Sequence, residues 1–171
     1  KKLGYPVNAT QPGALAEARA ELVRQKRLVR AYVNAEVRDQ LIAGDVLAAQ
    51  AWTITAQQAM AASRDLDFAH PAEGFSMYAD CAVVLRESAR AELAHKFVNY
   101  LLRPRVAASI AVAARASTPN SSARALLPPE IQGNQVLYPP PEVLARGEWL
   151  EALPSSAQRL RDRYWTEIKS S

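Results

Sequence analysis

The chain has 171 residues, of which 49% are hydrophobic and 22% charged, and its formal net charge is +4. This composition is typical of a globular protein with a sizeable core, and the length suits one ordinary domain or two small ones. No run of about 18 apolar residues offers a transmembrane helix. The opening KKLGYPVNAT has no apolar stretch behind its lysines, so no signal peptide is expected; the missing initiator Met favours a processed protein or a fragment.

Strands and helices are predicted to alternate along the first half of the chain. Thr10 is the expected N-cap of the first helix, and Gly44 the residue that closes the second. In chain order, the predicted elements are helix 13–25, strand 30–34, helix 37–43, strand 46–52, helix 53–63 and strand 67–70.

The second half is predicted to be mainly helical. Pro104 cannot continue a helix but suits the first turn of the next one, and proline-rich connections at 127–130 and 138–142 separate the later helices. The predicted elements are strand 78–85, helix 87–102, helix 105–114 and helix 155–169. The alternation indicates an α/β architecture with parallel strand pairing.

Few residues offer metal or redox chemistry. Cys81 is the only cysteine, which excludes an intrachain disulfide, and its place in the apolar run CAVVL predicts a buried thiol. His70 and His95 lie far apart without ligand spacing. We therefore expect no metal, no cofactor and no catalytic residues.

The basic balance raises nucleic acid as a partner. The basic residues of AEARAELVRQKRLVR, however, are interspersed with glutamates, which is typical of a solvated helix face. A small basic α/β module that binds nucleic acid is kept as an alternative. An enzyme on the same scaffold is a further alternative, although no nucleophile elbow or glycine-rich phosphate loop supports it.

Several blocks in the chain, in order, resemble one family. They are HKFVNYLLRPRVAASIA, STPNSSARALLPPEI, LYPPPEVLARGEWLE and RYWTEIKS, preceded by KKLGYPVNAT and the VLAAQAW run. Together they resemble the C-terminal half of the periplasmic spermidine/putrescine-binding proteins, the substrate-binding components of polyamine ABC importers. The resemblance covers essentially all 171 residues.

The resemblance implies a two-lobe, type II periplasmic-binding-protein-like α/β fold, of which this chain is an incomplete fragment. Residues 1–77 are expected to form a second-lobe α/β segment. Residues 78–119 are expected to form a hinge crossing and a first-lobe strand–helix segment, and residues 120–171 C-terminal helices that pack back on the second lobe. With part of one lobe missing, residues 80–115 should expose apolar surface, which favours self-association.

The candidate ligand-binding residues are Trp52, Tyr78, Asp80 and Asn34. A polyamine needs carboxylates for its ammonium groups and aromatic faces for its methylenes. Tyr78 and Asp80 are two positions apart, so on an extended segment both side chains point the same way. By resemblance, Trp52 matches a cleft Trp, Asp80 matches an aspartate that pairs with a ligand amine, and Asn34 falls near a polar cleft position.

Two departures affect the expected ligand. Ala116 stands where many members of the family carry a ligand-contacting Tyr, and Leu150 where a Gln often contributes. Spermidine is therefore less expected than a shorter diamine, another organic cation, or a non-polyamine solute bound by the same fold. The expected function is capture of such a cation in the periplasm for the membrane permease of an ABC importer.

Overall fold

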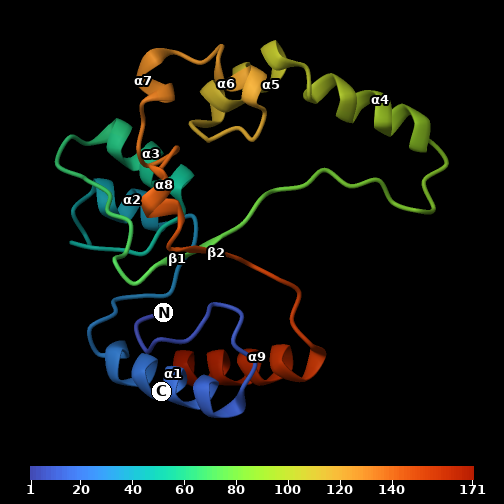
Figure 1. Ribbon diagram of the computed structural model, residues 1–171. Helices are drawn as coiled ribbons and strands as arrows, with labels where there is room; N and C mark the ends of the chain where they lie inside the picture. The colour runs from blue at the N-terminus through green and yellow to red at the C-terminus, as the bar shows by residue number, and fades with distance from the viewer. The chain divides into compact units, whose positions relative to one another are not determined.

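The computed structural model describes residues 1–171 and divides them into two compact units. Unit 1 consists of residues 1–37, 70–78 and 142–171, and unit 2 of residues 38–69 and 79–141. The helices and strands, shown in Figure 1, are α1 (Pro12–Lys26), α2 (Val37–Ile42), α3 (Thr53–Ala62), β1 (Phe75–Met77), α4 (Ala91–Leu101), α5 (Pro104–Ala114), α6 (Ser121–Arg124), α7 (Pro129–Gln132), α8 (Pro141–Leu144), β2 (Gly147–Trp149) and α9 (Ser155–Ser170).

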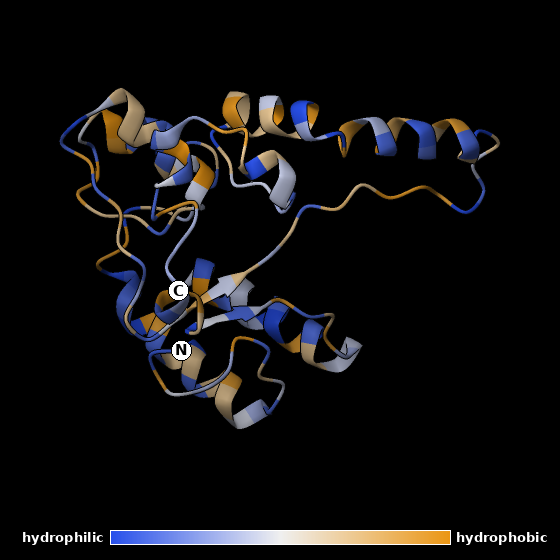
Figure 2. Cartoon of the chain, turned by 45° about the horizontal axis from the view of Figure 1, so that its top comes forward, coloured by the Kyte–Doolittle hydropathy of each residue, from blue (hydrophilic) through white to orange (hydrophobic).

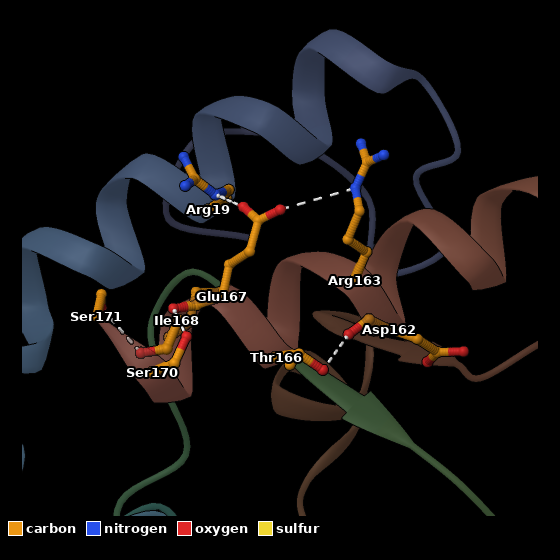
Figure 3. Close-up of polar contacts among 8 residues, drawn as sticks. All are labelled: Arg19, Asp162, Arg163, Thr166, Glu167, Ile168, Ser170 and Ser171. Carbon is orange, nitrogen blue, oxygen red and sulfur yellow. Dashed lines mark hydrogen bonds and ion pairs between the residues drawn. The ribbon is translucent and has the colours of Figure 1, made fainter.

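In unit 1 the first and last helices of the chain, α1 and α9, lie side by side (Figure 1). Each helix buries small and aliphatic side chains: Ala14 and Leu15 on α1, and Ala157 and Ile168 on α9. Polar contacts continue the pairing at the surface, where Glu167 accepts a hydrogen bond from Arg19 at 2.5 Å and lies 3.7 Å from Arg163 (Figure 3).

The strands β1 and β2 form a parallel pair in unit 1, in which Phe75 is in register with Gly147 and Met77 with Trp149. The Leu150 N–H donates to the Met77 carbonyl at 2.9 Å, which extends the pairing by one step. The predicted parallel pairing is confirmed, although neither β1 nor β2 was among the predicted strands.

The N-terminal segment is held against the C-terminal part of unit 1. Arg161 donates through Nη2 to the carbonyls of Val7 at 2.8 Å and Ala9 at 2.7 Å. Asn8 donates to the Trp149 carbonyl at 2.8 Å and accepts from the Glu151 N–H at 3.1 Å. These bonds satisfy backbone groups that no helix or strand satisfies.

Glu148, on β2, joins the same segment through an ion pair with Lys1 and a 2.7 Å hydrogen bond from the Val7 N–H. The Lys1 contact first, and then the Val7 N–H, hold the pKa of the Glu148 carboxyl below its usual value. A lowered folded-state pKa contributes stability above the unfolded pKa, and that contribution is lost as the pH falls through the folded one.

The Glu148→Gln variant should therefore melt about 1–3 °C below the unmodified chain at pH 7, since exposed ion pairs contribute little. The difference should shrink as the pH falls below about 4.5, the ordinary Glu value. Thermal unfolding followed by circular dichroism from pH 2.5 to 7 measures it. Glu151→Gln is the control, because the Glu151 side chain makes no ion pair. A Glu148→Gln difference that persists at pH 2.5 would contradict the assignment.

Unit 2 has a small core in which α5 and α6 meet. Its buried side chains are Ala108, Ala111, Ala123 and Leu127. Asn120 caps α6 by accepting from the Ala123 N–H at 3.0 Å, and donates to the Leu102 carbonyl at 2.8 Å. The alanines allow close helix approach, and the Asn120 bonds fix the chain between the two helices.

The predicted helices are confirmed with small shifts at their ends. The predictions 13–25, 37–43, 53–63, 105–114 and 155–169 correspond to α1, α2, α3, α5 and α9. Gly44 follows α2 with φ +74°, as expected. The helix predicted over 87–102 starts later, at Ala91. Thr10 is not the N-cap of α1: that position belongs to Gln11, which makes no side-chain capping bond.

The predictions of strands over 30–34, 46–52, 67–70 and 78–85 are wrong. None of the four has a neighbouring strand in this chain, and strand preference depends on such neighbours. Leu47 is fully exposed, Val83 is 78% exposed and Leu85 72%. Cys81 is exposed, which corrects the expectation of a buried thiol. As expected, the segment 80–115 exposes apolar surface.

The helix α5 ends at Arg115, the only non-glycine residue with a positive φ (53°). The following Ala116 N–H donates to the Ala111 carbonyl at 3.1 Å, which closes the helix. A side chain is disfavoured in this left-handed conformation. Arg115→Gly should therefore raise the free energy of unfolding by about 0.5–1 kcal/mol, measured by urea titration. Ala113→Gly, inside the helix, should lower it by about 1 kcal/mol; destabilisation by Arg115→Gly would contradict this reading.

Candidate ligand-binding site

Tyr78 directly follows β1 in unit 1, and its side chain is 43% exposed. Leu150 directly follows β2 and is 49% exposed. Since β1 and β2 are parallel, their carboxyl ends meet at one edge, where α/β sheets tend to bind ligands. Tyr78 and Leu150 continue the register as the next pair along the strands. The structure therefore places Tyr78 next to Leu150, one of the two positions at which the sequence departs from the family.

Trp149 is a third apolar residue at this edge, at the end of β2 and 57% exposed. Trp149 was not among the residues predicted to bind a ligand. The available signal was its place in GEW, directly before Leu150, but no strand was predicted there. The carboxyl edge of the parallel pair in unit 1 thus offers two aromatic surfaces and one aliphatic one.

Asp80 is exposed and belongs to unit 2. Its carboxylate makes no hydrogen bond or ion pair within residues 1–171, so it is available to an external cation. The expectation that Tyr78 and Asp80 point the same way depended on a strand over 78–85. That strand is absent, and the two residues belong to different units, so their common orientation stays a prediction.

Trp52 occupies the N-cap position of α3 in unit 2, with extended backbone angles, and is 43% exposed. It was expected at the end of a strand; instead its carbonyl accepts from the Ala56 N–H at 3.0 Å and starts a helix. Asn34 is exposed in unit 1, where its backbone N–H donates to Glu36 at 3.3 Å. Asn34 and Tyr78 thus belong to unit 1, and Trp52 and Asp80 to unit 2. A common site of the four stays a prediction.

A hollow of about 470 Å³ lies in unit 1 between the starts of α1 and α9 and contains none of the predicted site residues. It is lined by Thr10, Pro12, Ser156, Ala157, Arg159, Leu160 and Arg163. Two guanidinium groups and no carboxylate face this hollow, which is the wrong charge for an ammonium ligand. The hollow is therefore not a candidate site for a cation.

No group of three or more His, Cys, Asp or Glu side chains in residues 1–171 could hold a metal ion. No helix combines the length and apolar character needed to cross a bilayer.

Comparison with known proteins gives consistent results. The model of the family described as bacterial extracellular solute-binding protein matches residues 1–137. The chain is 31% identical over 170 residues to the spermidine/putrescine-binding periplasmic protein of Escherichia coli, covering 99% of this chain and 49% of that protein. It is 30% identical over 175 residues to the putrescine/cadaverine-binding protein of Pseudomonas aeruginosa, covering 99% and 49%.

Solved structures show the same fold over the same extent. The spermidine/putrescine ABC transporter substrate-binding protein of Streptococcus pneumoniae matches with a TM-score of 0.81 and 25% identity, covering 98% of this chain and 52% of that one. A chain from Listeria monocytogenes matches with a TM-score of 0.85 and 26% identity, covering 98% and 52%. The chain thus spans about half the length of these relatives and has the α/β fold of that half. The resemblance inferred from the sequence is confirmed, and the chain belongs to the bacterial extracellular solute-binding protein family.

Proposed function

We propose that the chain is part of an extracytoplasmic receptor that captures a polyamine or similar organic cation in the periplasm for an ABC importer. The observation that carries this proposal is the likeness, over 98–99% of the chain, to proteins named for binding spermidine, putrescine and cadaverine. The membrane permease of the importer is the proposed protein partner. The family is one of solute-binding receptors, and we propose no catalytic role.

In this proposal each candidate ligand-binding residue has a role that follows from the chemistry of its side chain. Asp80 supplies the carboxylate for one ammonium group, and its exposed, unpaired state supports that role. Tyr78 and Trp52 supply aromatic faces that cover methylenes and attract the cation. Asn34 offers an amide oxygen to an ammonium N–H.

The neighbour of Tyr78 favours a short or partly apolar cation. Leu150 follows β2 in parallel with Tyr78 and has no hydrogen-bonding side chain. Ala116, half-buried after α5, likewise offers no hydroxyl or ring. With fewer polar contacts for a third amine, we propose putrescine or another short organic cation over spermidine.

Titration of the 171-residue chain with putrescine, followed by two-dimensional amide NMR, tests the proposal. We expect shifts of the Tyr78–Cys81 amides and of the Trp52 indole N–H. Binding should be weak, since closure of a two-lobe receptor needs both lobes. Asp80→Asn should weaken it about two- to five-fold, the range for an exposed ion pair. Ammonium chloride at equal ionic strength controls for salt, and the Trp165 indole N–H on α9, which is not a candidate ligand-binding residue, is the internal reference. Shifts that are absent, or equal with ammonium chloride, would refute the proposal.

The nucleic-acid alternative gains no support from the basic helix α1. Arg24 and Lys2 both make ion pairs with Glu21, and Arg19 pairs with Glu167. The glutamates partly neutralise the cations that a phosphate backbone would need.

A further inference from the structure

Leu150, which follows β2, is held by hydrogen bonds on both sides of the chain. On the side of β1, its N–H donates to the Met77 carbonyl at 2.9 Å. On the other side, the Asn8 side chain donates to the Trp149 carbonyl at 2.8 Å and accepts from the Glu151 N–H at 3.1 Å. The two sides are opposite because the C=O and N–H of a trans peptide point in opposite directions. The two bonds of Asn8 therefore bracket Leu150.

The pattern of these two bonds is the one that a neighbouring parallel strand would give. In a parallel pair, a residue donates to the carbonyl before its partner residue and accepts from the N–H after it. The carboxamide of Asn8 offers the same donor and acceptor as a peptide group. The Asn8 side chain thus takes the place beside Leu150 that a residue of a third strand would occupy.

The backbone on each side of Asn8 is fixed as well. The Val7 N–H donates to Glu148 on β2 at 2.7 Å. Arg161 on α9 donates to the carbonyls of Val7 at 2.8 Å and Ala9 at 2.7 Å. These bonds hold the start of the chain beside the strand pair, as Figure 2 shows. The Asn8 carboxamide is therefore presented to β2 from a fixed backbone.

Tyr78 and Leu150 lie on the same face of the strand pair. An added Cβ at Gly147 would come within 2.9 Å of the Phe75 ring and 2.7 Å of Met77 Sδ, so these three positions share one face. Successive side chains of a strand point to opposite faces. The positions that follow β1 and β2, Tyr78 and Leu150, therefore point to the other face. The bond from the Leu150 N–H to the Met77 carbonyl keeps them paired.

We propose that Asn8 is a positioning residue of the candidate site, which holds Leu150 beside Tyr78 so that the two side chains form one apolar wall for the methylenes of the cation. This inference rests on the proposed function. The carboxamide of Asn8 is occupied by its bonds to the chain around Leu150, so Asn8 acts through Leu150 and not on an ammonium group. Its effect on binding should therefore disappear when the Leu150 side chain is removed.

A double-mutant cycle on the complete 171-residue chain tests the inference. Asn8→Ala removes both bonds and should raise the Kd for putrescine about two- to four-fold, because Leu150 is no longer held beside Tyr78. In a Leu150→Ala background, the same Asn8→Ala change should alter the Kd by less than about 1.3-fold. Titration with putrescine, followed by two-dimensional amide NMR, measures all four values of Kd.

Asn120→Ala is the matched control for Asn8→Ala. Asn120 also makes one donor and one acceptor bond, to the Leu102 carbonyl at 2.8 Å and from the Ala123 N–H at 3.0 Å, but in unit 2. Each alanine variant loses two hydrogen bonds and should melt about 4–8 °C lower. Only Asn8→Ala should also raise the Kd for putrescine, so a loss of stability alone would not give the expected result.

Two further measurements need no ligand. The Tyr78 ring of the unmodified chain should show a nuclear Overhauser effect to the Leu150 methyl groups, and Asn8→Ala should weaken it. The Glu151 amide should exchange hydrogen at least about tenfold faster in Asn8→Ala, because its acceptor is gone.

Three results would overturn the inference. They are a Glu151 exchange rate that ignores Asn8→Ala, an equal change in Kd with and without the Leu150 side chain, and no Overhauser effect between Tyr78 and Leu150 in the unmodified chain. The last of these decides even if Asn8→Ala does not fold. If the unmodified chain does not bind putrescine, the proposed function fails, and the exchange rate and the Overhauser effect still decide whether Asn8 positions Leu150.

Discussion

Replacing Gly74 with alanine is expected to lower the free energy of unfolding by about 3–5 kcal/mol. Gly74 has φ +101°, a conformation that side chains rarely adopt. An added Cβ would lie 2.3 Å from the Arg146 carbonyl oxygen and 2.9 Å from Lys1 Cε. The lysine chain can move away. The Arg146 carbonyl cannot, because it directly precedes β2, and displacing it would break the strand pair.

The control for this change is Gly44→Ala. Gly44 also has a positive φ, +74°, but an added Cβ would meet nothing within 4 Å. It therefore measures the backbone cost alone, about 1–2 kcal/mol. Urea unfolding followed by tryptophan fluorescence reports on β2 through Trp149. Equal losses in the two variants would mean that the clash with Arg146 does not matter.

The second large effect is expected at Arg161, on α9. Its two hydrogen bonds, to the carbonyls of Val7 and Ala9, hold the N-terminal segment, and Ala9 is only 6% exposed. Arg161→Met keeps most of the aliphatic packing but leaves both carbonyls without this donor. Hydrogen bonds from a charged group contribute about 1.5–3 kcal/mol each. We expect a loss of about 3 kcal/mol, because water can partly replace the donor.

Arg159→Met is the matched control for Arg161→Met, since Arg159 is exposed on the same helix and donates no hydrogen bond within the chain. Its effect should stay within about 0.5 kcal/mol. Arg161→Lys should fall between the two, because an ammonium group lacks the planar, fixed donors of guanidinium. If Arg161→Met and Arg159→Met unfold at the same urea concentration, the hydrogen bonds do not hold the segment.

The helices could be predicted because their signals are local. Pro12 and Pro104 fall in the first turns of α1 and α5, and Gly44 follows α2 with the positive φ that a helix end favours. The strands could not be predicted in the same way. CAVVL and VLAAQAW have the composition of buried strands, but a strand forms only where another strand pairs with it. The short GEW strand, by contrast, has little periodicity and forms because β1 lies beside it.

The candidate site was predictable in its residue types more than in its arrangement. The exposed ring of Tyr78 and the exposed carboxylate of Asp80 have the chemistry that the sequence suggested. The neighbours of Tyr78 were not foreseen, since Leu150 and Trp149 reach it through pairing across 72 positions. The Asn120 side chain was missed too: its cap of α6 is local, but its bond to the Leu102 carbonyl joins positions 18 apart and depends on the course of the chain between α5 and α6.

The interleaved course of the chain bears on how quickly it can fold. Unit 1 joins residues 1–37, 70–78 and 142–171, and the bond from Arg161 to Val7 links positions 154 residues apart. Contacts that close such long loops slow folding, because the conformational entropy of the loop is lost before the contact stabilises the chain. Unit 2 has the contiguous stretch 79–141, whose contacts close much shorter loops. During synthesis unit 2 can therefore fold first. The helix α1 and the strand β1 can form their contacts only after β2 and α9 have been synthesised.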